Sequence, residues 1–218
     1  MTLKLVIGNK SYSSWSMRPW LALRANNIPF EEILISLYSG EADKQQILDF
    51  THSGKVPVLV DGDVTIWDSL AIIEYVAERF PEKRLWPERP AQRAHARSIS
   101  AEMHSGFAAL RNECGMNLHR PVGAIELSTE ARANIARVEE IWGDCRARYG
   151  QSGPFLFGGF TAADAMFAPV VHRFRTYAVA VTVETQRYID TMMALPAFRE
   201  WTKAGLAETI VIEKFETV

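Results

Sequence analysis

The sequence predicts an α/β domain with the element order βαβ-α-ββα, followed by an all-helical domain. Three observations predict this fold class. Over about the first 80 residues, short β-rich runs alternate with helical stretches. A charged stretch with three prolines, PEKRLWPERPAQR, comes next, and beyond it the apolar periodicity is helical throughout. We therefore expect a first domain over residues 1–80, a linker over 81–92 and a helical domain over 93–218.

Four short runs rich in β-branched and other apolar residues predict the strands of the first domain. They are expected at Leu3–Ile7, Glu31–Leu37, Val56–Val60 and Val64–Trp67. The periodic stretches MRPWLALRANN and SLAIIEYVAERF predict helices after the first and fourth strands, and a further helix is expected between the second and third. Asp61-Gly62 is a tight-turn dipeptide, so the last two strands should form an antiparallel hairpin.

The helical domain is expected to contain three long helices and two shorter ones. The long helices are predicted at Arg93–Met116, Thr129–Tyr149 and Ala162–Tyr177, and the shorter ones begin at Thr185 and Pro196. Just before the third long helix, Thr161 and Asp164 stand in the S/T-x-x-D spacing of a capping box. We assign this motif to the folding and stability of a buried helix.

Composition places the chain among ordinary soluble globular proteins, since 48% of its residues are hydrophobic and 23% are charged. Lys and Arg total 24 and Asp and Glu total 26, so the formal net charge is 24 − 26 = −2, and there is no basic block to bind a nucleic-acid backbone. The N-terminal stretch MTLKLVIGNK is too short in apolar content for a signal peptide, and no apolar run approaches the length of a membrane span. We expect a cytoplasmic protein with no nucleic-acid or membrane partner.

The cysteines and histidines do not favour a redox or metal site. Cys114 and Cys145 are far apart and form no C-x-x-C, so we expect neither a disulfide framework nor a dithiol motif and interpret both as buried apolar residues. The five histidines show no ligand spacing with one another or with a cysteine. We therefore expect no protein-built metal site.

The stretch NKSYSSWSMRPW, residues 9–20, places four serines within six positions after the first predicted strand. Pro19 has no N–H to donate, so a helix should accommodate it only in its first turn, which makes Ser16 the expected N-cap. Ser13 and Ser14 then lie just ahead of a helix N-terminus, where unpaired N–H groups and the helix dipole favour an anion. Two interpretations stay open: the serines only cap and turn the chain, or their hydroxyls donate to a bound anionic group.

A second constellation lies in SGKVPVLVDGDVTIWDS, residues 53–69. A cis Val56-Pro57 bond would turn the backbone N–H and C=O of Val56 toward an open groove, where they could pair with an extended peptide ligand. An ordinary trans proline at a sheet edge is the alternative. Lys55, directly before this bond, is a candidate partner for a ligand carboxylate.

Asp68 and Ser69 stand at the start of the periodic helix LAIIEYVAERF. One interpretation is an ordinary helix cap. In the other, the hydroxyl and N–H of Ser69 hold a ligand carboxylate while Asp68 pairs with a ligand ammonium group.

A stripe in the first helix of the second domain, AEMHSGFAAL, places Met103, His104 and Phe107 at positions i, i+1 and i+4. Met103 and Phe107 share a helix face, and Gly106 permits close approach by another group. The stripe either packs in the core or lines a pocket for an apolar ligand.

Together these features resemble a cytosolic glutathione transferase, and the resemblance covers essentially the whole chain. It is carried by VPVLVDGDVTIWDSLAIIEYV and FTAADAMFAPV, which correspond to the family's cis-proline strand, acidic-Ser motif and helix cap. The resemblance implies a thioredoxin-like N-terminal domain, an all-helical C-terminal domain, a homodimer and a role in detoxification.

The serine stretch is similar to the serine-type active site of the zeta and theta classes, in particular to bacterial members. The zeta motif is S-S-C-S-W-R, and SSWSMR places Ser13 at the family's catalytic serine, Ser16 at its second small polar position and Arg18 at its arginine. Trp15 stands where the zeta class has cysteine, Asp68 stands where it has glutamine, and THSGKVP lacks the common Asn-Pro.

The resemblance implies that glutathione is the co-substrate and that no metal takes part. The γ-glutamyl end of glutathione would be held by Asp68 and Ser69. Its backbone would lie along Val56 and Pro57, and its glycyl end near Lys55.

The same resemblance places the sulfur of glutathione at Ser13. We count Ser14 and Ser16 with it as catalytic residues, with Ser16 capping the helix and Ser14 shaping the turn or assisting. A donated hydrogen bond would hold the sulfur as a thiolate, which attacks a small hydrophobic electrophile. The implied walls of the electrophile pocket are Trp15, Met103, His104 and Phe107.

Two alternatives remain open. The chain could bind glutathione, other ligands or partner proteins without catalysing a reaction, or it could be a zeta-like glutathione-dependent isomerase. A thiol-disulfide oxidoreductase of the same superfamily is disfavoured, because neither Ser13 nor Ser16 is a cysteine.

Overall fold

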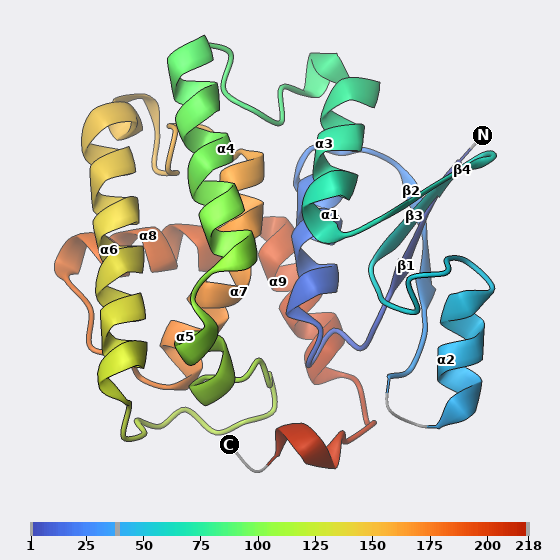
Figure 1. Cartoon of the computed structure of the whole chain (residues 1–218). Helices are drawn as coiled ribbons and strands as arrows, with labels where there is room; N and C mark the ends of the chain where they lie inside the picture. Colours follow the sequence, from blue (N-terminus) through green and yellow to red (C-terminus); the bar gives the residue numbers. More distant parts are fainter. Residues whose placement is uncertain (1, 38–39, 217–218) are drawn as a thin grey trace.

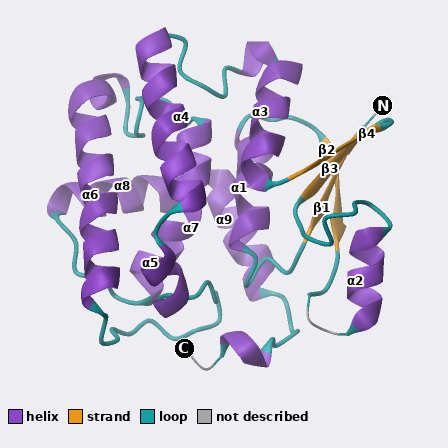
Figure 2. Ribbon diagram, viewed as in Figure 1, coloured by secondary structure: helices purple, strands orange, loops and turns teal. Residues whose placement is uncertain are grey.

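In the computed structural model, which describes residues 2–37 and 40–216, the N-terminal part is built on a four-stranded mixed sheet (Figures 1 and 2). β1 and β2 run parallel, whereas β3 is antiparallel to both of its neighbours. The predicted βαβ unit and the predicted hairpin are therefore both present. The strands, in the spatial order β2-β1-β3-β4, are β1 Leu3–Ile7, β2 Phe30–Leu34, β3 Val58–Asp61 and β4 Val64–Trp67.

Two strands differ in length from the prediction. β3 begins at Val58 rather than at Val56, directly after Pro57, which has no N–H to donate to the sheet. β2 covers residues 30–34 rather than 31–37. The hairpin between β3 and β4 turns through Gly62, whose φ of 61° lies in the region that favours glycine.

Three helices accompany the sheet: α1 Ser14–Ala25, α2 Glu41–Leu48 and α3 Ser69–Arg79. α1 and α3 lie between the sheet and the C-terminal helices, and α2 lies on the opposite side (Figure 1). Because α1 packs against α7 and α9 as well as α3, its N-terminus is held by both halves of the chain.

The start of α1 differs from the sequence prediction, in which Ser16 is the cap. The N-cap is Ser13, whose Oγ accepts the N–H of Ser16 at 3.3 Å, so Ser16 is the third helical residue. Pro19 consequently lies inside the helix, where it cannot donate to the carbonyl of Trp15 four residues earlier. The helix tolerates this loss because packing stabilises it: every residue from Ser16 to Leu23 is buried.

The C-terminal part is all-helical, with α7 at its centre. Every residue of α7 except Arg175 is buried, and α7 packs against α1, α4 and α8. No helix in the described part of the chain is long and apolar enough to cross a membrane. The helices are α4 Pro90–Ser105, α5 Ala108–Glu113, α6 Thr129–Tyr149, α7 Ala162–Thr176, α8 Val183–Ala194 and α9 Pro196–Leu206, with short 3-10 turns at Pro81–Lys83, Gly150–Ser152 and Glu213–Phe215.

The single helix predicted over 93–116 is wrong, because the chain breaks between α4 and α5. α4 begins at Pro90, which suits the first helical position, and ends at Ser105. Gly106 leaves the helical region, and a Cβ there would lie 2.9 Å from the carbonyl oxygen of Glu102. Phe107 follows with a positive φ of 60°. Glycine thus ends α4, and α5 starts in a new direction.

The predicted capping box is present at the start of α7. The N–H and hydroxyl of Thr161 donate to Asp164 Oδ2 at 2.8 and 2.9 Å. Asp164 Oδ1 accepts the N–H of Leu156 at 3.1 Å and the hydroxyl of Tyr188 at 3.0 Å. Burial nevertheless raises the pKa of Asp164 to about 6. The carboxylate joins α7 to α8 and to the preceding loop.

Candidate active site

The serines around the N-terminus of α1 have different surroundings. Ser16 is fully buried, and its Oγ accepts the N–H of Gly8 at 3.1 Å and lies 2.8 Å from Ser13 Oγ. Ser16 therefore ties the end of β1 to the helix. Ser13 and Ser14 line a cavity, and the Ser14 side chain is only half-buried. Of the three serines predicted to act on a ligand sulfur, the structure brings Ser13 and Ser14 to a cavity wall and places Ser16 behind them.

This cavity, which we call the sulfur cavity, has a volume of about 660 Å³. Its walls come from both halves of the chain, so it lies between the sheet domain and the helices. Besides Ser13 and Ser14, its lining includes Tyr12, Trp15, Leu37, Lys55, Val56, Arg111, Asn112, Met116, Arg173 and Phe215.

A neighbouring cavity of about 490 Å³, which we call the peptide groove, shares Trp15, Lys55 and Val56 with the sulfur cavity. It extends along the N-terminus of α3. The Val56-Pro57 bond is cis, as the first interpretation of this segment predicted. The groove therefore brings together the five residues predicted to hold an extended ligand: Lys55, Val56, Pro57, Asp68 and Ser69.

Asp68 both caps α3 and faces the peptide groove. Its Oδ1 accepts the N–H groups of Leu70 and Ala71 at 2.9 and 3.2 Å, while Oδ2 lies 3.1 Å from Nε2 of His104 on α4. The two interpretations of Asp68 are thus compatible, since one oxygen serves the helix and the other remains at the groove. Ser69 Oγ is buried and has no hydrogen-bond partner in the part of the chain that the structure describes. Buried polar groups are normally satisfied, so this hydroxyl is suited to a polar ligand.

The residues predicted to line an electrophile pocket do not lie around one cavity in the structure. Met103 and Phe107 are 1% and 7% exposed and belong to the hydrophobic core. His104 lines the peptide groove beside Asp68 instead of the sulfur cavity. Of the four predicted residues, Trp15 alone is among the side chains that line the sulfur cavity.

His104 has a lowered pKa. Burial lowers its pKa below the ordinary value, and the positive charges of Arg18 and Arg111 act in the same direction, against the opposing effect of Asp68.

Trp15 forms part of both cavities and is enclosed by cations. The guanidinium carbons of Arg18 and Arg111 lie 4.2 and 4.9 Å from the centre of its ring, and His104 meets it edge-on at 5.2 Å. Cations stabilise an indole face through its quadrupole, so Trp15 is held in a fixed orientation.

Two arginines that line the sulfur cavity, Arg111 and Arg173, were not predicted as site residues from the sequence. Arg111 donates to the carbonyls of Met103 and His104 at the end of α4. Arg173 donates to the carbonyl of Cys114 at 3.0 Å and lies 3.4 Å from Ser14 Oγ. Arg173 stands on the most deeply buried helix of the chain, and a charge within such an apolar stretch is the signal that could have identified it.

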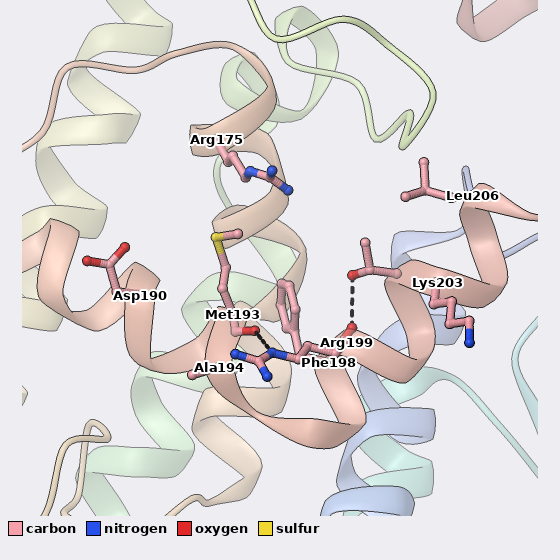
Figure 3. Close-up of a pocket in the computed structure, with 9 residues that line it drawn as sticks. Arg175, Asp190, Met193, Ala194, Phe198, Arg199, Lys203 and Leu206 are labelled. Atoms are coloured by element: carbon pink, nitrogen blue, oxygen red, sulfur yellow. Dashed lines mark hydrogen bonds between the residues drawn. The ribbon is translucent and has the colours of Figure 1, made fainter.

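A third cavity, of about 520 Å³, lies at α7, α8 and α9 and contains none of the serines or groove residues (Figure 3). Phe198 and Met193 form its apolar floor, and Arg175, Arg199 and Lys203 lie around it. We therefore do not assign the chemistry to it.

The cysteines are buried, as interpreted from the sequence, and burial raises the pKa of Cys114 to about 11 and that of Cys145 to about 12. Among residues 2–37 and 40–216, no group of three or more His, Cys, Asp or Glu side chains is placed to hold a metal ion.

Comparison with protein families gives a match in each half of the chain. Residues 12–79 match "Glutathione S-transferase, N-terminal domain", and residues 88–204 match "Glutathione S-transferase, C-terminal domain". The second match alone covers more than half of the chain.

The similar proteins are named either maleylacetoacetate isomerase or glutathione S-transferase. A probable maleylacetoacetate isomerase of Caenorhabditis elegans is 43% identical over 104 residues, which is 47% of each chain. A maleylacetoacetate isomerase of Pseudomonas aeruginosa is 29% identical over 95% of this chain and 99% of its own. Glutathione S-transferase GstB of Escherichia coli is 28% identical over 83% of this chain and 88% of its own. The first match thus spans about half of the relative's length, whereas the Pseudomonas match spans nearly all of it.

Solved structures share the fold. A glutathione transferase homolog from Burkholderia gl BGR1, with bound glutathione, superimposes with a TM-score of 0.72 at 21% identity, covering 95% of this chain and 100% of that one. Ure2p in complex with glutathione gives a TM-score of 0.70 at 19% identity, covering 93% and 94%. At these identities the likeness is one of fold.

Proposed function

We infer that this chain, which belongs to the glutathione S-transferase family, binds glutathione across the two joined cavities and activates its thiol at the N-terminus of α1. The observation that carries this proposal is the meeting of three features around two neighbouring cavities that share Trp15, Lys55 and Val56. These are the hydroxyls of Ser13 and Ser14, the cis Val56-Pro57 segment and the unpartnered Ser69 hydroxyl.

The peptide groove fits the non-reacting parts of glutathione. The γ-glutamyl carboxylate would accept from Ser69, whose Oγ is otherwise unsatisfied, and its ammonium group would contact Asp68 Oδ2. The backbone of the cysteinyl residue would pair with Val56. Lys55 is exposed at the shared edge of both cavities and suits the glycyl carboxylate.

The thiol would then lie in the sulfur cavity beside Ser13 and Ser14. A free thiol has a pKa of about 8.5 and is mostly protonated at neutral pH. Each pKa unit corresponds to about 1.4 kcal/mol, so a decrease of about two units needs roughly 3 kcal/mol. A hydroxyl donating to the charged sulfur supplies about 1.5–3 kcal/mol, and the N–H groups at the start of α1 add to it.

The thiolate would attack the electrophilic carbon of a second substrate, forming a C–S bond. Glutathione-dependent isomerisation is the second candidate function, favoured by the Pseudomonas relative that aligns with almost the whole chain. It uses the same thiolate. A homodimer and a cytoplasmic location belong to the same proposal, on the basis of the family, and light scattering after size exclusion would measure the oligomeric state.

The test is the thiol pKa of bound glutathione, measured from thiolate ultraviolet absorbance across pH in the native protein. We expect a pKa below that of free glutathione. S-methylglutathione, which has no thiol, should displace glutathione and abolish the signal. Binding with an unchanged thiol pKa would instead indicate a non-catalytic ligand-binding protein, and the absence of binding would refute the proposal.

A further inference from the structure

The residues just before Ser13 are held by the segment that follows α9. We call this segment, residues 208–216, the C-terminal strap. Glu208 accepts two main-chain N–H groups, one on each carboxylate oxygen: that of Lys10 at 2.7 Å and that of Ser11 at 2.9 Å. Both loop residues are buried, at 7% and 0% exposure. These N–H groups have no other acceptor in the described part of the chain, and burying an unpaired N–H is unfavourable, so the loop depends on this carboxylate.

A second carboxylate of the C-terminal strap holds the next residue of the loop. Tyr12 donates its hydroxyl to Glu216 Oε1 at 2.7 Å, and the same oxygen accepts Asn117 Nδ2 at 2.9 Å. The Tyr12 hydroxyl also accepts the N–H of Ile212 at 3.4 Å, and the ring stacks on Phe215 with the ring centres 5.7 Å apart. Burial raises the pKa of Tyr12 and the bond to Glu216 acts in the same direction, so the hydroxyl keeps its proton at neutral pH. Three consecutive loop residues are thus bound to the strap.

Ser13 is coupled to these residues because they belong to one turn. The N–H of Ser13 donates to the carbonyl of Asn9 at 2.8 Å, and the N–H of Tyr12 donates to the same carbonyl at 3.2 Å. Ser13 is the N-cap of α1, but its ψ of 85° lies outside the extended region that an N-cap residue usually adopts. The direction of its hydroxyl is therefore set by the preceding turn as well as by the helix.

We propose that Glu208 and Glu216 are positioning residues for thiol activation, which hold residues 10–12 so that the hydroxyl of Ser13 stays aimed at the sulfur of bound glutathione. Neither glutamate is among the side chains that line the sulfur cavity or the peptide groove, so both act through the loop. This inference rests on the proposed function, since it takes Ser13 as the hydroxyl that meets the thiol.

Two measurements on each variant separate positioning from a general loss of structure. The thiol pKa of bound glutathione, taken from thiolate absorbance across pH, reports the hydrogen bond to the sulfur. Calorimetric binding of S-methylglutathione, which has no thiol, reports the rest of the ligand site. A misdirected hydroxyl raises the thiol pKa and leaves S-methylglutathione affinity nearly unchanged, whereas a disordered site weakens both. Thermal melting is recorded in parallel.

The variants separate the hydrogen bonds of the glutamates from their charge. Glu208→Ala removes the acceptor, whereas Glu208→Gln removes the charge but keeps an accepting oxygen. Tyr12→Phe breaks the bond to Glu216 without changing any charge and keeps the ring that stacks on Phe215. Glu216→Ala removes the same bond from the other side.

Glu213→Ala is the matched control. Glu213 is an exposed glutamate in the same strap, three residues before Glu216, and among the described residues its carboxylate holds none of the loop. If Glu208→Ala fails to fold, Tyr12→Phe and Glu216→Ala still decide the question, because they leave both main-chain bonds of Glu208 in place.

We expect Glu208→Ala to raise the thiol pKa of bound glutathione by about 0.5–1 unit and to lower turnover at neutral pH by about 3- to 10-fold, with S-methylglutathione affinity within a few-fold of native. Glu208→Gln should recover most of this loss, because its amide oxygen still accepts. Glu216→Ala and Tyr12→Phe should raise the thiol pKa in the same direction, and Glu213→Ala should match the native protein.

Three results would overturn the inference while leaving the proposed function in place. One is an unchanged thiol pKa in Glu208→Ala, Glu216→Ala and Tyr12→Phe. Another is an equal rise in Glu213→Ala, and the third is a thiol pKa that falls alike in Glu208→Ala and Glu208→Gln, the sign of an effect of charge alone. If the native protein itself does not lower the thiol pKa, the proposed function fails and this inference fails with it.

Discussion

Ser13→Ala tests which hydroxyl activates the thiol. In the structure, Ser13 Oγ has two contacts: it accepts the N–H of Ser16 at 3.3 Å and lies 2.8 Å from Ser16 Oγ. Ser16 Oγ also accepts the N–H of Gly8, so Ser16 keeps a partner when Ser13 loses its hydroxyl. The hydroxyl proton of Ser13 is therefore able to rotate toward a bound sulfur without leaving Ser16 unsatisfied.

The substitution has two separable effects. Removing the N-cap acceptor costs about 1 kcal/mol of stability, typical of a capping serine replaced by alanine. Removing a donor to the thiolate costs about 1.5–3 kcal/mol, which at about 1.4 kcal/mol per unit raises the pKa of the bound thiol by about one to two units. Turnover near neutral pH should fall by roughly 10- to 100-fold, and it should recover as the pH rises toward the new thiol pKa.

Ser14→Ala is the matched comparison, because Ser14 lines the same cavity but caps no helix. The thiol pKa of bound glutathione is measured from thiolate absorbance in both variants, with glutathione affinity measured by calorimetry. A raised thiol pKa in Ser13→Ala with little change in affinity supports Ser13. A normal pKa in Ser13→Ala and a raised one in Ser14→Ala would refute the reasoning. It would assign the thiolate to Ser14, whose oxygen lies 3.4 Å from the Arg173 guanidinium.

The remaining predictions concern ligand binding, pH dependence and backbone packing. Asp68→Asn keeps a capping oxygen but removes the negative charge, so glutathione affinity measured by calorimetry should fall roughly 10-fold or more, with little change in melting temperature. Burial lowers the pKa of His172 to about 3, from 6.5 in the unfolded chain. The folded state therefore resists protonation, and stability should decrease as pH falls below 6.5, with a slope of at most about 1.4 kcal/mol per unit from this group; urea unfolding of His172→Gln should show a flatter profile. Gly106→Ala would place a Cβ 2.9 Å from the carbonyl oxygen of Glu102, and urea unfolding should show a loss of about 1–3 kcal/mol.

The features that the sequence predicted well are those set by local interactions. The hairpin follows from Gly62, which accepts a positive φ, and the capping box follows from the three-residue spacing of Thr161 and Asp164. Both involve residues close together in the chain, so their geometry depends little on the rest of the fold. The order of strands and helices follows in the same way from apolar periodicity.

The errors occurred where distant packing decided the outcome. Proline chemistry alone placed the start of α1 at Ser16, but contacts with both halves of the chain stabilise a longer helix that begins at Ser14 and contains Pro19. The end of α4 is the one local exception: a Cβ at Gly106 would meet the carbonyl oxygen of Glu102, four residues earlier, and apolar periodicity does not reveal this. The sequence also did not reveal that Arg111 and Arg173 line one cavity with Ser13 and Ser14, because these residues come from distant parts of the chain.

The loop that carries the serines is fixed by the far end of the chain. The carboxylate of Glu208, just beyond α9, accepts the N–H groups of Lys10 and Ser11 at 2.7 and 2.9 Å, and Ser11 Oγ donates to the carbonyl of Gly205 at 2.6 Å. A Cβ at Gly205 would lie 3.3 Å from the main chain of Lys10, so the two segments are in close contact. The position of Ser13, two residues after Ser11, therefore depends on α9 as much as on the sheet. The helical domain therefore does more than line a pocket: an isolated N-terminal domain would retain the serines and the cis segment but lose the three hydrogen bonds that fix the loop.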